Sequence, residues 1–189
     1  MSVNLRTLVL NRNYMPISVF PLHTIPAEDA MTRLSAPATV RVVAEYDRVI
    51  KTQNPLFRER WPSIVARVTG KPIGQRAELS RDFLYYRDHG KCAYCAKDLT
   101  ISKLTYDHVV PQCDGGPTTW ENVVASCEKC NSAKGNLAAK GIWKPRQKPY
   151  KPDYWTLLGI RKTFPIVVAD KQWIDFLGDW KGEIRVWNP

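Results

Sequence analysis

Four of the five cysteines form two identical pairs, and such pairs bind metal. Cys92-Ala-Tyr-Cys95 and Cys127-Glu-Lys-Cys130 each place two thiols across a short loop. Thiolate is a soft ligand that suits zinc, and two such loops supply the four ligands of one tetrahedral ion. The sequence therefore predicts a structural Zn²⁺ site. The alternative is four buried or redox-active cysteines. Cys113, the fifth, is expected to be an unligated thiol.

The stretch between the two pairs, residues 96–126, is longer than the roughly 15–20 residues of a simple zinc ribbon. It contains Asp107-His108 and Asn122, and Asn131 follows the second pair. Imidazole is suited to taking a proton near neutral pH. Carboxylate and amide oxygens suit a hard ion such as Mg²⁺. Together these groups could supply the activated water and the charge stabilisation that phosphodiester hydrolysis requires.

The two cysteine pairs and the polar residues between and after them, taken in sequence order, resemble the zinc-stapled form of the HNH endonuclease motif, with asparagine as the third motif residue. The matching positions are Cys92, Cys95, Asp107, His108, Asn122, Cys127, Cys130, Asn131, Lys134 and Gly135. The resemblance runs from Arg81 to Asn136, and the opening Leu8-Val-Leu-Asn11-x-x-Tyr14-x-Pro16 is less specifically similar to bacterial and phage HNH proteins. Ala96 stands where relatives often have glycine, which affects a turn and not the chemistry.

The resemblance implies an α+β fold with a ββα-metal (His-Me finger) core and a structural zinc. His108 would be the general base, and Asp107 and Asn131 would ligate a catalytic Mg²⁺ or Mn²⁺. Asn122 would orient the loop or the ring of His108. The function implied is a metal-dependent DNA endonuclease. The alternative is a zinc-stabilised nucleic-acid-binding protein without catalysis, which would not need Asp107, His108 and Asn131 together.

Adjacent strand residues point to opposite faces, so Asp107 and His108 can serve one site only if the strand distorts. Pro111 makes such a break plausible. On the helix side, Asn131 and Lys134 are three residues apart and share a face.

The surrounding elements follow from periodicity and from helix start and stop signals. Three segments are expected: a mixed α/β region over 1–78, an HNH nuclease domain with the zinc site over 79–141, and a basic arm with a Trp-rich extension over 142–189. Expected strands are 7–10, 39–45 and 103–110. Expected helices are 26–34 with Thr24 as N-cap, 80–88 between Ser80 and Gly90, and 127–134 between Ser126 and Gly135.

The basic arm, residues 132–152, has six basic residues, no acidic residue and three prolines, so we expect an extended segment. Its predicted phosphate contacts are Lys134, Lys144, Arg146, Lys148 and Lys151. For Lys134 a solvated position at the helix end is an equal alternative. The C-terminal tryptophans are interpreted as core residues rather than as platforms for stacked bases.

Composition agrees with a polyanionic partner. The net charge is +10, with 44% hydrophobic and 24% charged residues. This indicates DNA, double-stranded first, with RNA left open as a substrate. The longest apolar stretch, Phe164–Ala169, is far shorter than the roughly 20 residues of a membrane span. No signal segment is found, so a cytoplasmic location is expected, and a homodimer is left open.

Overall fold

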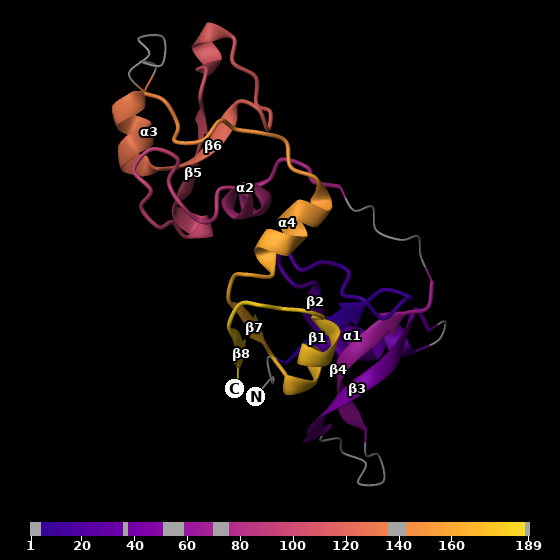
Figure 1. Cartoon of the computed structure of the whole chain (residues 1–189). Helices are drawn as coiled ribbons and strands as arrows, with labels where there is room; N and C mark the ends of the chain where they lie inside the picture. The colour runs from indigo at the N-terminus through magenta and orange to yellow at the C-terminus, as the bar shows by residue number, and fades with distance from the viewer. Residues whose placement is uncertain (1–4, 36–37, 51–58, 70–75, 136–142, 188–189) are drawn as a thin grey trace. The chain divides into compact units, whose positions relative to one another are not determined.

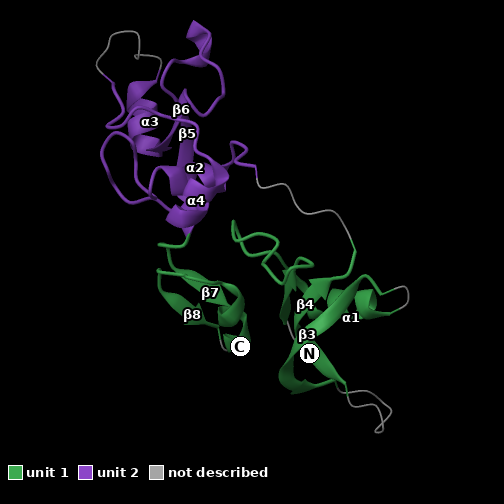
Figure 2. Ribbon diagram, turned by 45° about the vertical axis from the view of Figure 1, so that its right-hand side comes forward, with its two compact units in different colours: residues 1–74, 162–189 green, residues 75–161 purple. Residues whose placement is uncertain are grey.

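The computed structural model describes residues 5–35, 38–50, 59–69, 76–135 and 143–187. The chain folds as two compact units, coloured separately in Figure 2: unit 1 is Met1–Gly74 with Lys162–Pro189, and unit 2 is Gln75–Arg161. These units differ from the three consecutive segments expected from the sequence. The segment expected over 142–189 is divided between the two units, and its second part joins the N-terminal region.

Unit 1 is built on a four-stranded sheet with the order β2-β1-β4-β3 (Figure 1). Its elements are β1 (Arg6–Leu10), β2 (Thr24–Pro26), α1 (Ala27–Leu34), β3 (Val40–Val49) and β4 (Arg60–Arg67). Strands β1 and β4 are parallel, and the other neighbours are antiparallel. The strands and helix expected here are present, with one correction. Thr24 pairs with Leu8 inside β2 and does not cap α1, which follows Pro26 directly.

The C-terminal part of unit 1 completes the core of that unit. It contains the parallel pair β7 (Ile166–Val168) and β8 (Ile184–Val186), with a 3-10 helix over Lys171–Phe176. Trp173 is 2% exposed and packs with Leu8 and Ile64 of the sheet. Its indole Nε1 donates to the carbonyl oxygen of Ser63 at 3.1 Å. Trp173 is therefore a core residue as predicted, whereas Trp155 is 63% exposed.

Unit 2 contains two antiparallel strands followed by a helix. These are β5 (Leu104–His108), β6 (Val123–Cys127) and α3 (Glu128–Lys134), accompanied by α2 (Arg81–Arg87) and α4 (Tyr154–Arg161). Pairing is regular from Leu104 opposite Cys127 to His108 opposite Val123. The mixed α and β content of the expected fold class is confirmed. Among the helices that the structure describes, none has both the length and the apolar character that crossing a membrane requires.

The helix starts in unit 2 agree in one case with the sequence and differ in the other. Ser80 caps α2, because its side chain accepts a hydrogen bond from the Phe83 amide. For α3 the cap is Cys127 and not Ser126: the Cys127 Sγ accepts from the Cys130 amide at 3.4 Å. Ser126 still belongs to β6, where it lies opposite Thr105. The helix therefore begins within the second cysteine pair.

Arg87 ties α2 to the start of β6. Its guanidinium donates to the carbonyl oxygens of Trp120 and Val123, both at 2.7 Å, and to the Asp88 carboxylate. Arg87 is only 2% exposed. Around it, the core of unit 2 consists mainly of Leu84, Cys92, Leu104, Trp120, Val123 and Ala125. This clamp holds α2 against the strand pair that carries the predicted site.

Candidate functional site

The four paired cysteines come together as the sequence predicts. The sulfur atoms of Cys92, Cys95, Cys127 and Cys130 all lie within 4.8 Å of one another. The Cys95 and Cys127 sulfurs are 3.9 Å apart. A tetrahedral zinc with bonds of about 2.3 Å would separate its sulfurs by about 3.8 Å. The cluster is therefore positioned to bind a metal such as zinc. Cys113 is exposed and lies outside it.

A tight turn forms the first half of this cluster. The Ala96 amide donates to the Cys92 carbonyl at 2.9 Å, and the Cys92 amide donates to the Lys97 carbonyl. Ala96 has a φ of 60°, a left-handed backbone that favours glycine. Glycine at this position would therefore fit the turn without strain.

The thiols of the cluster have opposing pKa shifts. Burial raises the pKa of Cys92, but hydrogen bonds from the Cys95, Cys127 and Tyr94 amides outweigh it and lower the value to about 6. Burial and neighbouring thiols raise the pKa of Cys130. The chain therefore favours thiolate at Cys92, while mutual repulsion opposes ionising all four sulfurs. A divalent cation would remove that repulsion.

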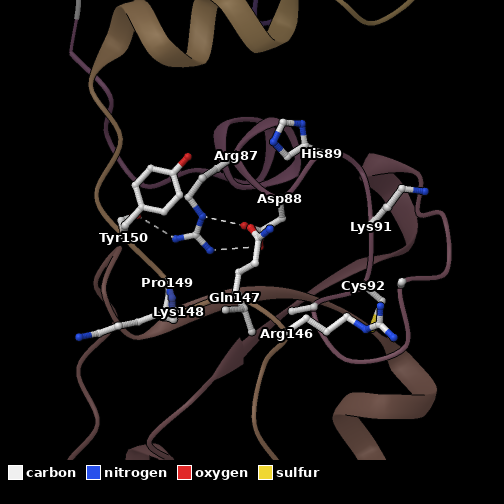
Figure 3. A pocket seen from close by; sticks show the side chains of 13 residues that line it. Arg87, Asp88, His89, Lys91, Cys92, Arg146, Gln147, Lys148, Pro149 and Tyr150 are labelled. Carbon is white, nitrogen blue, oxygen red and sulfur yellow. Dashed lines mark hydrogen bonds and ion pairs between the residues drawn. The ribbon is translucent and has the colours of Figure 1, made fainter.

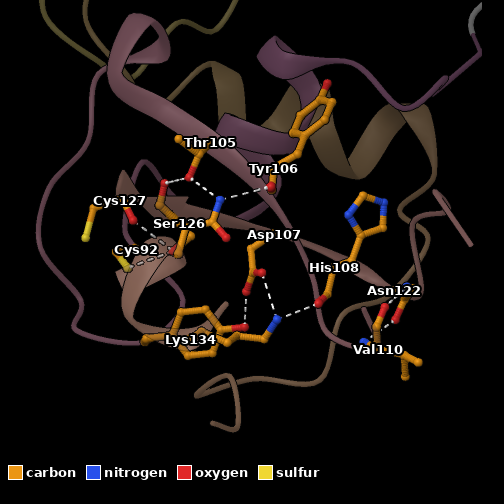
Figure 4. Close-up of polar contacts among 12 residues, drawn as sticks. Cys92, Thr105, Tyr106, Asp107, His108, Val110, Asn122, Ser126, Cys127 and Lys134 are labelled. Atoms are coloured by element: carbon orange, nitrogen blue, oxygen red, sulfur yellow. Dashed lines mark hydrogen bonds and ion pairs between the residues drawn. The ribbon is translucent and has the colours of Figure 1, made fainter. Parts of the chain in front are cut away.

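Asp107 lies in a buried polar network that joins β5, α3 and the first cysteine loop (Figure 4). The Asp107 side chain is 4% exposed, and the Lys134 Nζ is 2.9 Å from its Oδ1. The Tyr94 hydroxyl donates to Oδ2. Lys134 also donates to the carbonyl oxygen of His108 at 2.7 Å. The carboxylate is therefore held from two sides. Burial and the Asp107 carboxylate raise the pKa of Tyr94, so the hydroxyl stays a donor.

The position of Lys134 corrects the sequence interpretation. Its side chain is 1% exposed, so it is neither a solvated helix-end cation nor open to a phosphate. The reason is tertiary: α3 lies against β5, which brings the buried Asp107 carboxylate to the Lys134 ammonium.

The His108 side chain lies away from this network. In Figure 4 its ring points in a different direction from the Asp107 carboxylate. The His108 Nε2 is 2.8 Å from the Thr118 Oγ1. Strand pairing stays regular through His108, so β5 does not distort, and the alternation of strand faces separates the two side chains.

Asn131 lies one helix turn before Lys134 and faces β5. Its Nδ2 donates to Thr105 Oγ1 at 3.2 Å and to the Tyr106 carbonyl at 3.3 Å. Asn131 and Asp107 thus bring an amide and a carboxylate to the junction of α3 and β5. Carboxylate and amide oxygens are of the kind that suits Mg²⁺ or Mn²⁺, but in this structure both Asp107 oxygens are already engaged, by Lys134 and by Tyr94.

Asn122 holds the loop that follows β5. Its Oδ1 accepts from the Val110 amide at 2.8 Å, and its Nδ2 donates to the carbonyls of Val110 and Pro117. Asn122 is 7% exposed. Asn122 is expected from the sequence to orient either this loop or the ring of His108, and the contacts in the structure are with the loop.

Residues 92–142 match the family model described as HNH endonuclease. The resemblance to this family is confirmed. The CRISPR-associated endonuclease Cas9 of Corynebacterium diphtheriae is 43% identical over 89 residues, which is 47% of this chain and 8% of that protein. The Type II-C Cas9 enzyme from Actinomyces naeslundii has a TM-score of 0.28 at 21% identity, over 57% of this chain and 14% of that chain. The chain thus spans a small part of the relatives it matches.

The HNH segment contains two functional candidates that sequence reasoning missed. Tyr94 contacts the Asp107 carboxylate, and Thr118 contacts the His108 ring. Tyr94 lies inside the first cysteine pair, so its spacing alone could have suggested a contact near the metal cluster. No pattern in the sequence indicates Thr118, because loop folding brings it to His108.

The described part of the basic arm that follows the HNH segment, from residue 143 on, is hydrogen-bonded to the first cysteine loop. Lys144, Arg146, Lys148 and Lys151 are exposed as expected. The Arg146 amide donates to the Ala93 carbonyl at 2.9 Å, and its Nε donates to the Tyr94 carbonyl. Residues 136–142, which include Lys140, lie outside the described part of the chain.

Proposed function

We propose that this protein is a metal-dependent endonuclease that hydrolyses phosphodiester bonds of DNA. The observation that carries the proposal is the His108 imidazole at the end of β5, within the segment that matches HNH endonucleases. The net charge of +10 supports a nucleic-acid substrate, and the named relative is an endonuclease.

His108 acts as the general base. Its ring takes a proton from water as the oxygen bonds to phosphorus, and the bond from phosphorus to the 3′ oxygen breaks. Only one nitrogen of a neutral imidazole is basic. In the tautomer in which Nε2–H donates to the Thr118 hydroxyl, Nδ1 is the nitrogen that takes the proton. Thr118 is then a positioning residue.

The proposal includes two different metals, because cysteine thiolates suit zinc whereas oxygen ligands suit Mg²⁺ or Mn²⁺. The four cysteines hold a structural Zn²⁺. A catalytic Mg²⁺ or Mn²⁺ would stabilise the negative charge that develops on phosphate. Asp107 and Asn131 would be its ligands only after the Asp107 carboxylate is released from Lys134 and Tyr94 and comes to the His108 side of β5; in this structure the carboxylate is held on the other side. The Tyr94 hydroxyl fixes the orientation of Asp107, and Asn122 fixes the loop beyond His108.

The experiment is cleavage of supercoiled plasmid by the zinc-loaded chain with added Mg²⁺ or Mn²⁺. We expect nicking that requires the divalent ion. His108→Ala should lower the rate by about 10²- to 10⁴-fold, since a general base contributes about that much. DNA binding and zinc content should be unchanged. Wild-type cleavage by this variant would rule out His108 as the base.

A nucleic-acid-binding protein without catalysis is the second candidate. The observation that favours it is the engagement of both Asp107 oxygens, by Lys134 and by Tyr94. Under this alternative the chain binds plasmid but leaves it supercoiled with every divalent ion tried. The same assay therefore separates the two functions.

A further inference from the structure

A pocket of about 300 Å³ opens where the end of α2 and the first cysteine loop meet the basic arm (Figure 3). Arg87 forms part of its wall and donates to the Tyr150 carbonyl at 3.2 Å. Arg146 is bonded through its backbone to Ala93. The wall is therefore tied together across segments that are distant in sequence. We call this the basic pocket.

Most of the charged side chains that line the basic pocket are cationic. Among the described residues that line it, four have cationic side chains and only Asp88 has an acidic one. The Asp88 carboxylate is already bonded to Arg87 and to the Ala125 amide at 2.7 Å. The remaining cations, Lys91, Arg146 and Lys148, are exposed. Lys91 pairs with Asp98 at 2.6 Å, on a side chain that is 87% exposed, and such a contact contributes little.

The geometry points to the basic pocket as a binding site for the phosphate backbone of one nucleic-acid strand. Lys148 and Lys91 line opposite ends of the pocket and Arg146 lines it as well, so a strand that crosses the pocket passes all three cations (Figure 3). The volume is at the small end of the range for ligand pockets, which suits a single nucleotide unit. Tyr150, which is 44% exposed, offers apolar surface for the attached sugar or base.

This inference rests on the proposed function for its ligand, but it goes further. The sequence predicts contacts spread along the arm, whereas the pocket concentrates them. Lys148 lines the pocket, and Lys144 of the same arm does not. In the first cysteine loop, Lys91 lines it and Lys97 does not. All four are exposed.

The test compares two matched pairs, Lys148→Glu with Lys144→Glu and Lys91→Glu with Lys97→Glu. Each change alters the net charge equally, so any general electrostatic effect is the same within a pair. Binding of a fluorescent DNA duplex is measured at several salt concentrations. The protein is the zinc-loaded chain with His108→Ala, which prevents cleavage. Zinc content and circular dichroism verify that every variant is folded.

We expect the pocket variants to bind about tenfold more weakly and the control variants to bind nearly as well as their parent. The slope of log affinity against log salt should fall by about 0.9 for Lys148→Glu, the value for one phosphate. Equal losses within both pairs would overturn the pocket and favour contacts spread along the arm. Binding of inorganic phosphate that depends on the pocket lysines, with duplex binding unchanged by the same substitutions, would instead indicate a free-anion site and overturn the strand assignment. If the chain with His108 intact binds DNA in this way but never cleaves it, the proposed function alone is contradicted.

Discussion

Lys134 and Asp107 form an ion pair that is almost fully buried, so removing one charge leaves the other without its partner. We predict that Lys134→Met lowers the free energy of unfolding by about 3–5 kcal/mol. Urea unfolding of the zinc-loaded chain measures this.

The double variant Lys134→Met/Asp107→Asn is the control for this loss. It removes both charges and should recover a large part of the stability. If the double variant is as unstable as the sum of the single variants, the ion pair does not account for the effect.

Ala96 has the left-handed φ of 60° in the turn between the first cysteine pair and Lys97. Ala96→Gly should raise the free energy of unfolding by about 0.5–1 kcal/mol, because glycine has no Cβ to strain this backbone. Thermal unfolding of both chains measures the change. Ala93→Gly is the matched control: Ala93 lies in the same loop without a positive φ, so this change should destabilise. A lower melting temperature for Ala96→Gly would contradict the argument.

At the scale of the element, the loop after β5 depends on a close approach at Gly116. A Cβ there would lie 1.8 Å from the Val110 carbonyl oxygen and 2.9 Å from Nδ2 of Asn122. We predict that Gly116→Ala displaces the loop, which lowers both stability and nicking of plasmid.

Gly115→Ala is the control for this change. Gly115 has a φ of 80° but no atom within 4 Å of an added Cβ, so it should lose only about 1–2 kcal/mol of stability and keep its activity. Equal loss of activity in the two variants would show that the contacts of Gly116 are not what matters.

The cysteine cluster joins the first loop to the start of α3, so metal removal should release both elements. One zinc per chain is expected by elemental analysis, and a strong chelator should cause a large loss of ordered structure by circular dichroism. Cys130→Ser should abolish zinc binding. Cys113→Ser should change nothing, because Cys113 lies outside the cluster. Full zinc content in Cys130→Ser would exclude the proposed ligand set.

At the scale of the whole molecule, residues 162–189 complete the core of unit 1 and not that of the HNH segment. Deleting them removes Trp173 from its contacts with the sheet and should leave unit 1 unfolded or aggregating. Unit 2, Gln75–Arg161, should keep its zinc, which elemental analysis of the truncated chain measures. Loss of zinc together with unit 1 would show that the two units fold as one.

The sequence by itself determined the features that depend on short spacing. Two thiols three positions apart can only lie in one loop, so the cysteine pairs predicted a common cluster, and the sulfurs do converge. Ser80 indicated its helix start, because capping involves residues within one turn. Alternation along a strand puts Asp107 and His108 on different sides unless the strand distorts; the distortion that Pro111 made plausible is absent, and regular pairing of β5 keeps the two side chains apart.

Only the tertiary structure decided which distant groups meet. Lys134 resembled a surface cation because nothing near it in sequence is buried with it, and its partner Asp107 belongs to another element. Trp173 and Ser63 likewise meet only because the C-terminal segment packs on the N-terminal sheet. Burial and long-range pairing depend on which faces the folded elements cover, and local periodicity carries no information about that choice.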